Sequence, residues 1–350
     1  MNIAVLISGG VDSSVALRLL REEGHELTAF YLKIWLEDEL SSLGECPWED
    51  DLKYVRVVCE QAQVPLQVVP FQLEYKERII DHTISEARAG RTPNPDMLCN
   101  ARIKFGAFYD CVGNEYDKIA TGHYARVEEK DGTTFLKMSP DPIKDQTYFL
   151  SQLSQAQIAR ALFPIGDFKK NEVRKLAEQF ALPNAKRKDS QGICFLGKIP
   201  FDKFLEHHLG KRPGKLIEYE TQKVLGEHNG FWYFTVGQRR GIHLSGGPWY
   251  VAAKNIKTNE IFISRAGRDE MPARYELGVS GCNWISGTPP EKKALSVKVR
   301  HGAKMYPAEI EYLENNRLRV KFQEKDRGIA PGQFAVLYDG EYCLGGGVME

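Results

Sequence analysis

The sequence predicts an α/β protein with a parallel-sheet domain first, a small β-rich domain in the middle and an antiparallel β-barrel at the end. Three observations predict this. Apolar strands alternate with helical segments over the first part of the chain. After about Pro200, glycines become frequent and the strands short. From about Arg268, apolar and polar residues alternate cleanly between turns. The predicted domains are therefore 1–197, 198–267 and 268–350.

The first domain contains four predicted strands that alternate with predicted helices. The strands are expected at residues 3–7, 25–35, 66–71 and 118–124. The helices are expected at residues 50–62, 75–89, 97–111 and 152–182, with another directly after Ser14. Strands in this arrangement form a parallel sheet covered by helices on both faces, and ligands bind beyond the carboxyl ends of its strands.

The second and third domains are predicted from short strands. Residues 231–236 and 249–251 are the candidates in the middle domain. The barrel strands are expected at residues 295–300, 308–312, 317–322 and 334–338. No internal repeat or low-complexity segment interrupts this order.

Composition narrows the class of protein. The chain has 350 residues, of which 42% are hydrophobic, and its 47 basic and 47 acidic residues cancel, so net charge indicates no partner. No apolar run has the length of a membrane span, and the first strand leaves no room for a leader, so we expect a cytoplasmic protein. Seven cysteines without a C-x-x-C pair favour a reducing compartment and argue against a zinc ribbon or an iron–sulfur cluster.

The stretch after the first strand has the pattern of an anion-binding loop. Ser8-Gly9-Gly10-Val11-Asp12-Ser13-Ser14 joins a buried strand to a helix N-terminus, where free N–H groups and the helix dipole favour negative charge. No Gly-Lys-Ser/Thr follows and the G-x-G-x-x-G spacing is absent, which excludes the lysine-bearing phosphate loop and the dinucleotide fingerprint. Leu32 and Gly122, near the ends of two other strands, are candidates for an adenine and ribose pocket, although plain strand packing explains them equally.

A second informative stretch, residues 92–100, reads TPNPDMLCN. We expect Asp96 to cap the following helix and Cys99 to lie near its third position, where the dipole lowers a thiol pKa. The carboxylate of Asp96, one turn away, works against this, so the pairing makes more sense if Asp96 handles a proton or a substrate group. The simpler alternative is a capping Asp96 and a core Cys99.

A third stretch surrounds Cys194. Gly192 and Gly197 flank it, which is typical of a loop that can move. The basic triplet at 186–188 suits a polyanion or a thiolate, and a solvated loop face explains it equally well.

These motifs carry a resemblance to known families. The residues from Ser8 to Ser13 resemble the PP-loop of the ATP pyrophosphatases, whose domain is of the adenine nucleotide alpha hydrolase-like type. Together with the other motifs, the chain resembles the tRNA-specific 2-thiouridylase family (MnmA/TrmU) over essentially its whole length. The further motifs are residues 92–96 with Cys99-Asn100, 103–106, 120–124, 144–146, 188–190 with 192–195, and 235–239.

The resemblance implies an activity. Members of this family use ATP to adenylate the C2 oxygen of the wobble uridine, U34, in tRNAs for Lys, Glu and Gln, and replace it with a persulfide sulfur. By position, Cys194 matches the persulfide carrier, Cys99 the nucleophile that can form a disulfide with it, and Asp96 the acid/base residue. Mg²⁺ is expected with the ATP, no zinc or iron–sulfur cluster is needed, and a protein of a cysteine-desulfurase relay is the expected sulfur donor.

The resemblance also implies two sets of contacts. The ATP contacts are Leu6, Ile7, Ser8, Gly9, Gly10, Val11, Asp12, Ser13, Leu32 and Gly122. The tRNA contacts are Asn94, Pro95, Asp96, His123, Lys144, Asp145, Gln146, Arg300, His301 and Gln333, and the middle domain, residues 198–267, is also implied to contact tRNA. The sequence departs from many members at Leu32, Ile34 and Gln191, none of which is a reacting group.

Two alternatives remain open at this point. One is another PP-loop ATP pyrophosphatase, such as an amide-forming synthetase, although the chain offers no amidotransferase half and no reason for the two cysteine contexts. The other is a non-catalytic tRNA-binding protein that keeps a relic ATP site. It would bind tRNA indifferently to the loss of either cysteine.

Overall fold

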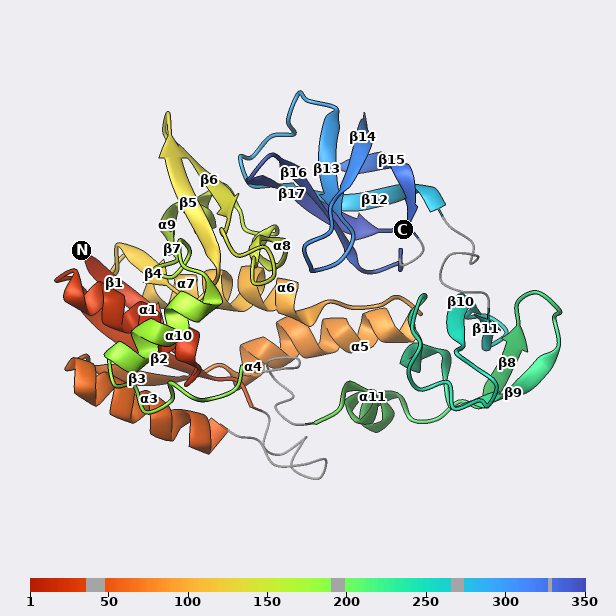
Figure 1. Ribbon diagram of the computed structural model, residues 1–350, viewed down its shortest axis with the longest axis horizontal. Helices are drawn as coiled ribbons and strands as arrows, with labels where there is room; N and C mark the ends of the chain where they lie inside the picture. Colours follow the sequence, from red (N-terminus) through yellow and green to blue (C-terminus); the bar gives the residue numbers. More distant parts are fainter. Residues whose placement is uncertain (36–47, 190–198, 266–273, 327–328) are drawn as a thin grey trace.

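The N-terminal domain is built on a parallel sheet. The computed structural model (Figure 1) describes residues 1–35, 48–189, 199–265, 274–326 and 329–350. The sheet has five strands in the order β3-β2-β1-β4-β7, with every neighbouring pair parallel. They are β1 (Asn2–Leu6), β2 (Glu26–Lys33), β3 (Leu66–Pro70), β4 (Lys118–Ala120) and β7 (Ala161–Leu162). The carboxyl ends of β2, β1 and β4 therefore meet at one edge, where a ligand of such a sheet binds.

Helices cover both faces of this sheet because its central strand is apolar on both sides. Ile3 and Val5 face one core, which contains α1 (Val11–Glu22), α3 (Trp48–Ala62) and α10 (Lys170–Gln179). Ala4 and Leu6 face the other. That second core includes α4 (Gln72–Tyr75), η2 (Lys76–Ile80), α5 (Asp81–Arg88), α6 (Pro95–Cys99), η3 (Asn100–Ala107), α7 (Phe108–Val112), α8 (Thr147–Leu150) and α9 (Gln155–Arg160).

The middle domain is small and mixed. The helix α11 (Phe201–Leu209) leads into a four-stranded sheet of order β10-β11-β8-β9. Its elements are β8 (Gly214–Glu218), β9 (Val224–His228), the short 3-10 helix η4 (Phe231–Tyr233), β10 (Tyr250–Asn255) and β11 (Glu260–Ser264). A separate apolar cluster that includes Trp249 and Ile261 forms its core.

The C-terminal domain is a closed antiparallel barrel of six strands. The strand order is β12-β15-β14-β13-β16-β17, and β17 pairs back to β12. The strands are β12 (Arg274–Trp284), β13 (Ala294–Lys298), β14 (Tyr306–Leu313), β15 (Arg317–Asp326), β16 (Phe334–Asp339) and β17 (Tyr342–Met349). Closure satisfies the edges that an open sheet exposes.

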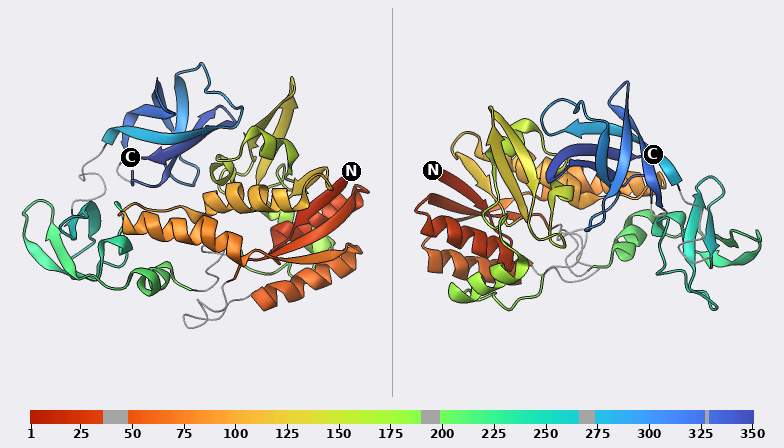
Figure 2. Two further views of the ribbon diagram at one scale, coloured as in Figure 1. Left: turned by 180° about the vertical axis from the view of Figure 1, so that it is seen from behind. Right: turned by 45° about the horizontal axis from the view of Figure 1, so that its top comes forward.

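A hairpin from the N-terminal domain extends the barrel sheet. The strands β5 (Ala125–Lys130) and β6 (Thr133–Met138) pair with each other, and β6 pairs with β17 through Lys137 opposite Tyr342 and Leu136 opposite Cys343. Figure 2 shows this hairpin beside the barrel from two further directions. The first and third domains therefore share one hydrogen-bonded sheet.

The predicted fold class is confirmed, while several predicted elements are wrong. The helix expected at 152–182 is two helices, α9 and α10, separated by the edge strand β7. The strand expected at 231–236 contains the 3-10 helix η4, which begins after Gly230 at φ +152°. The predicted boundaries near 197 and 267 lie outside the described residues and stay predictions. In the described part of the chain, no helix is both long and apolar enough to cross a membrane.

Candidate active site

The loop after β1 joins that strand to the start of α1, as the sequence predicts. Gly9 has φ +76°, and a Cβ there would lie 2.7 Å from the carbonyl oxygen of Asp51, so both its conformation and its packing favour glycine. Gly10 is the N-cap of α1 and supplies no capping side chain. Ser13 Oγ accepts from Ser8 N at 3.2 Å and lies 3.4 Å from Ser8 Oγ. The glycine N-cap leaves the start of α1 to an anion, with two hydroxyls beside it.

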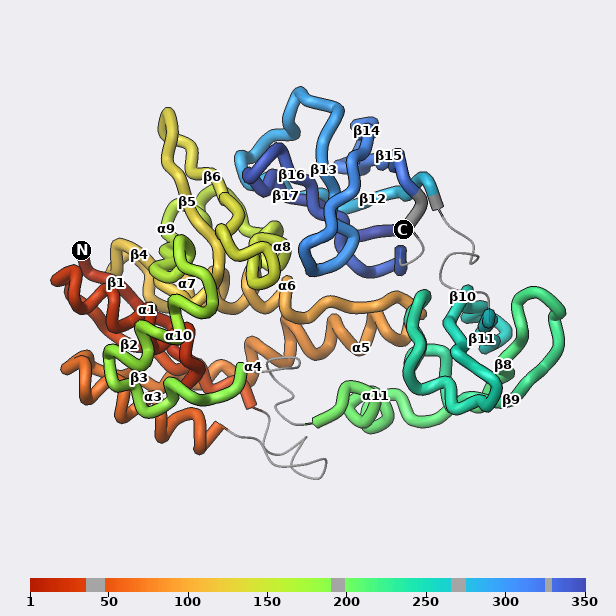
Figure 3. The backbone as a smooth tube through the Cα atoms, viewed as in Figure 1, coloured from red at the N-terminus to blue at the C-terminus, as the bar shows by residue number. Residues whose placement is uncertain are grey.

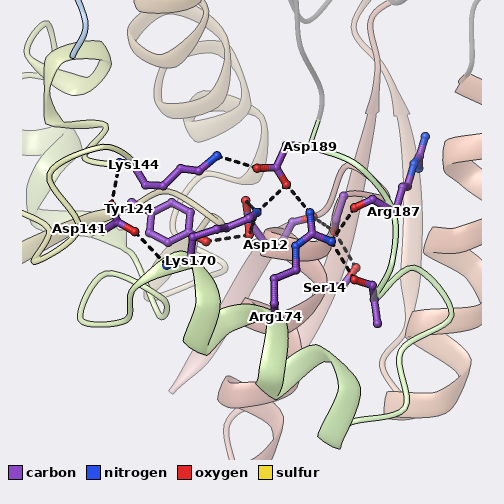
Figure 4. A network of polar contacts seen from close by, with 12 residues as sticks. Asp12, Ser14, Tyr124, Asp141, Lys144, Lys170, Arg174, Arg187 and Asp189 are labelled. Carbon is purple, nitrogen blue, oxygen red and sulfur yellow. Dashed lines mark hydrogen bonds and ion pairs between the residues drawn. The ribbon is translucent and has the colours of Figure 1, made fainter. Parts of the chain in front are cut away.

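A lysine from a distant helix meets this loop. Lys170, at the start of α10, places Nζ 2.8 Å from Asp12 Oδ1, 2.9 Å from Asp12 Oδ2 and 2.8 Å from Asp189 Oδ1 (Figure 4). Tyr124 donates its hydroxyl to Asp12 at 2.9 Å. The side chain of Lys170 is only 16% exposed, so its charge acts at the loop with little screening by solvent. The PP-loop contains no lysine, and Lys170 brings one to it from another element.

Asp189 gathers three cations at the edge of the same network. Lys144 and Arg174 each approach one of its oxygens to 2.6 Å, and Lys170 is the third. Burial by itself would raise the pKa of Asp189, but the hydrogen bonds and charges of Lys144 and Lys170 dominate and lower it to about 2. Asp189 is therefore ionised at neutral pH. It is the last described residue before the segment that carries Cys194, which lies outside the described residues.

Two further side chains fix the back of the loop. Asn184 donates Nδ2 to the Gly9 carbonyl oxygen and to Ser14 Oγ, both at 2.9 Å. Arg187 donates to the same carbonyl at 3.1 Å and forms an ion pair with Asp51. Arg187, in the basic triplet, is therefore held by the loop, while Lys186 and Lys188 are exposed.

Leu32 and Gly122 lie at the same edge of the sheet as the loop. Leu32 is next to the end of β2 and is partly exposed. Gly122 follows β4, and a Cβ on it would lie 2.6 Å from the backbone nitrogen of Ser13 and 2.7 Å from the carbonyl carbon of Asp12. The strand order places these two residues on the two sides of β1, at the edge where a ligand of such a sheet binds.

The helix that carries Asp96 and Cys99 differs from the expectation. Its N-cap is Asn94, whose Oδ1 accepts from Met97 N at 3.4 Å, and Pro95 is the first helical residue. Asp96 is therefore inside the first turn, and the prediction that it caps the helix is wrong. Cys99 is the fifth residue of α6, beyond the turn where the dipole is strongest.

Burial decides the state of the Cys99 thiol. The side chain is 3% exposed, and this burial raises the pKa of Cys99; Lys104 opposes the shift, Asp96 adds to it and a hydrogen bond with Tyr75 opposes it. The expectation of a lowered pKa is wrong because desolvation outweighs the dipole. A thiolate at Cys99 needs a group that accepts its proton.

Most of the predicted tRNA contact residues are buried or partly buried, and several of them hold other parts of the chain in place. His123 is only 8% exposed, bonds Thr121 Oγ1 through Nδ1 at 2.7 Å, and has its pKa held well below the usual value by burial and by Lys104. The Gln146 side chain accepts from Tyr124 N at 2.9 Å. The Lys144 side chain is 35% exposed.

The remaining predicted contact residues lie where the barrel meets the first domain. Asp145 is fully buried at the side chain and pairs with the equally buried Lys298 of the barrel at 2.9 Å. His301 stacks on Phe149 at 4.7 Å and bonds the Asp145 carbonyl oxygen at 3.1 Å. Arg300 reaches Tyr306. Gln333 donates to the carbonyl oxygens of residues 92 and 93 and accepts from Asn94.

Sequence reasoning missed Lys170, Arg174 and Asn184. The first two are four residues apart at the start of a short amphipathic helix, a spacing that puts both on one face. That signal marks a basic helix face, but nothing local points it at residue 12. Within the described residues, no group of three or more His, Cys, Asp or Glu side chains is arranged to hold a metal ion.

Family models match three consecutive parts of the chain. Residues 1–198 match a tRNA methyl transferase HUP domain, residues 202–265 a tRNA methyl transferase PRC-barrel domain, and residues 274–349 an aminomethyltransferase beta-barrel domain.

Curated relatives match over the full length. A protein of Parabacteroides distasonis described as tRNA-specific 2-thiouridylase MnmA is 46% identical over 355 residues, with 100% of this chain and 99% of that protein covered. A MnmA of Porphyromonas gingivalis is 43% identical over 359 residues, with the same coverage. A third, MnmA 2 of Bacteroides fragilis, is 43% identical over 353 residues, with 99% of each chain covered.

Proposed function

The chain belongs to the tRNA-specific 2-thiouridylase family MnmA, and we propose that it uses ATP to replace the C2 oxygen of the wobble uridine U34 with sulfur in tRNAs for Lys, Glu and Gln. The observation that carries the ATP half of the reaction is the glycine-capped start of α1, with Lys170 held against Asp12. A tRNA substrate and an odd number of cysteines fit a reducing cytoplasm.

ATP binds in this proposal with its phosphates on the PP-loop. The loop contacts are Leu6, Ile7, Ser8, Gly9, Gly10, Val11, Asp12 and Ser13, and the adenosine lies towards Leu32 and Gly122. Lys170 is held beside the loop by Asp12 and Asp189. In the reaction it also pairs with the departing pyrophosphate, which carries more negative charge than either carboxylate. The Asp12 carboxylate has the oxygen chemistry that Mg²⁺ prefers, so we assign the Mg²⁺ that accompanies ATP to this side of the loop.

The reaction proceeds in three displacements. The C2 oxygen of U34 attacks the α-phosphorus, a C2–O–P bond forms, and pyrophosphate leaves. The terminal sulfur of a Cys194 persulfide then attacks C2 and expels AMP, which is a far better leaving group than the original oxygen. Attack of the Cys99 thiolate on the Cys194 sulfur breaks the remaining S–S bond, leaves sulfur on the uridine, and forms a Cys99–Cys194 disulfide that an external dithiol reduces.

Asp96 completes this chemistry as the acid/base residue. The raised pKa of Cys99 keeps the thiol protonated at neutral pH, so a carboxylate one helical turn away is needed to take its proton. The uridine must leave the anticodon stack to reach this helix.

The proposed tRNA surface spans all three domains, because the resemblance also implies that the middle domain contacts tRNA. We assign the base contact to Asn94, Pro95 and Asp96. The remaining proposed contacts are His123, Lys144, Asp145, Gln146, Arg300 and His301. The buried members of this set do not touch the tRNA themselves in this proposal. They hold in place the loop that does. Gln333 is proposed to act on the tRNA site indirectly, through residues 92–94, which its amide holds. The sulfur donor is proposed to be a persulfide protein of a cysteine-desulfurase relay.

The test is sulfur incorporation into unmodified tRNA-Glu with ATP, Mg²⁺ and a persulfide source. Thiolated tRNA is read by its retarded mobility on a mercury-containing gel, and a tRNA with C34 in place of U34 is the control. A shift that needs ATP, U34 and Cys194 supports the proposal. ATP-dependent AMP release with tRNA but no shift keeps the pyrophosphatase and moves the doubt to the sulfur donor or the base, whereas AMP release that ignores tRNA would favour a small-molecule synthetase.

Two variants separate the half-reactions. Cys194→Ser is expected to bind tRNA and form AMP but not thiolate, and normal thiolation by that variant would remove Cys194 from the sulfur path. Asp12→Ala is expected to stop AMP formation, because Asp12 organises the loop and Lys170. Undiminished pyrophosphate release by Asp12→Ala would show that the phosphates bind elsewhere.

A further inference from the structure

The segment that enters the catalytic helix is held by both of the other domains. We call residues 90–94, between α5 and α6, the strap. In Figure 3 the orange tube of α5 runs out to the middle domain, turns there, and returns beneath the barrel to α6. The strap makes that turn, and its last residue, Asn94, caps α6. Any displacement of the strap is therefore passed to Asp96 and Cys99.

The barrel holds the strap through one loop. Gln333 Nε2 donates to the Thr92 and Pro93 carbonyl oxygens at 3.2 and 3.1 Å, and its Oε1 accepts from Asn94 Nδ2 at 3.3 Å. Thr92 N donates to the Pro331 carbonyl oxygen at 2.8 Å. Gly332 has φ +92°, and a Cβ there would lie 2.8 Å from Thr92 N. The barrel loop and the strap are thus packed backbone against backbone.

The middle domain holds the same segment from its own side. Thr92 Oγ1 and Thr235 Oγ1 lie 3.2 Å apart, within hydrogen-bond distance. Gly90 has φ +76°, and a Cβ on it would collide with Ile256 and lie 3.5 Å from the Phe231 ring. Glycine at this position allows the middle domain to approach the strap closely. Three domains therefore meet on five residues that lead directly into the catalytic helix.

We propose that Gln333 and Thr235 are positioning residues for the sulfur-transfer step, which set α6, and with it Asp96 and Cys99, through the strap. Neither side chain touches a reacting atom in this role. The amide of Gln333 is engaged on both its oxygen and its nitrogen by the strap. A tRNA that docks on the barrel and the middle domain thereby also fixes the helix that performs the chemistry. This inference rests on the proposed function.

The test uses three variants of the full chain. Gln333→Leu removes the three hydrogen bonds that the side-chain amide makes with the strap. Thr235→Val removes one hydroxyl at nearly constant side-chain volume. Gln323→Leu is the matched control, since Gln323 is an exposed glutamine of the same barrel, outside the loop that meets the strap. Circular dichroism checks that each variant is folded. If Gln333→Leu does not fold, Thr235→Val still tests the proposal.

The first readout separates tRNA affinity from rate. We expect Gln333→Leu to lower the single-turnover rate of thiolation at saturating tRNA by ~10- to 100-fold, because small misplacements of reacting groups cost about that much. The Kd for tRNA should change less than about twofold. Thr235→Val should lower the thiolation rate by a smaller factor. Gln323→Leu should change neither the rate nor the Kd. A weaker Kd with an unchanged rate would overturn the proposal, since it is the signature of a direct tRNA contact.

The second readout does not depend on activity. Cys99 is 3% exposed, so its labelling by iodoacetamide reports how firmly α6 is held. Peptide mapping should show Cys99 labelled at least ~10-fold faster in Gln333→Leu than in the wild type and in Gln323→Leu. Unchanged labelling would refute the positioning role. Absence of thiolation by the wild type would instead refute the proposed function, while faster Cys99 labelling in the variant would still support the strap.

Discussion

The buried ion pair between Lys298 and Asp145 offers a quantitative test of how the barrel is attached. Both side chains are 0% exposed, and Lys298 Nζ lies 2.9 Å from Asp145 Oδ2. Asp145 also accepts from Ser139 N at 3.2 Å and from the Thr147 hydroxyl at 2.9 Å. Lys298→Met keeps the length of the side chain but leaves this carboxylate buried without its cation.

The expected cost follows from the burial. Breaking a fully buried pair by removing one partner costs about 3–5 kcal/mol, because the remaining charge loses its compensation. Lys298→Met and Asp145→Asn should each show a loss of this size. The double variant should be less destabilised than either single variant, since no buried charge remains. The neutral donors to Asp145 bring the expected cost for Lys298→Met towards the lower end of the range.

Amide hydrogen exchange followed by mass spectrometry is the suitable assay, because unfolding of a three-domain chain is not a two-state process. Peptides from β13 and β16 report local opening at the pair. A loss of about 3 kcal/mol corresponds to exchange at least ~100-fold faster. Single-variant costs below about 1 kcal/mol, or costs that simply add in the double variant, would show that the pair is solvated and would refute the reasoning.

Three further results are expected. Lys170→Met should lower ATP-dependent AMP formation by ~100-fold, as loss of a preorganised charge does, while Lys175→Met, an exposed lysine on the same helix, should not; equal rates would release Lys170 from the site. Gly122→Ala should weaken ATP binding and cost about 1–3 kcal/mol of stability by overpacking, read by calorimetry and thermal melting, because its Cβ meets Ser13 N at 2.6 Å. The raised pKa of Cys99 means that less thiolate is present at neutral pH, so the alkylation rate of Cys99 should still rise above pH 9.0, the ordinary cysteine value. At neutral pH, Cys99 should also be alkylated more slowly than the exposed Cys111. A plateau of the Cys99 rate below pH 9.0 would contradict the burial effect.

Local patterns made the first domain predictable. The apolar run from Ile3 to Ile7 and the glycines after it are a complete strand-and-turn signal, and the strand, the turn and the helix that follow from it are present in the structure. The family prediction from the motifs is also confirmed. The hairpin at 125–138 has an Asp131-Gly132 turn between alternating strands, which is a local hairpin signal, although the predicted strands do not include it.

Tertiary effects made the rest unpredictable from local patterns. The neighbour of Asp12 is Lys170, 158 positions away, and only the fold brings them together. The state of Cys99 depends on how deeply α6 is packed, which the helix pattern does not reveal. Asn94, and not Asp96, caps that helix because Pro95 occupies the first helical position.

The pairing of β6 with β17 has a consequence for exchanging parts between relatives. In the linear sequence the barrel is a separate C-terminal domain. Its last strand, however, pairs with the hairpin formed by residues 125–138. A chimera cut near residue 268 would transplant the barrel without that hairpin and leave an unpaired strand edge on each fragment, which invites association with other chains. The hairpin and the barrel must therefore be exchanged together, although more than a hundred residues separate them along the chain.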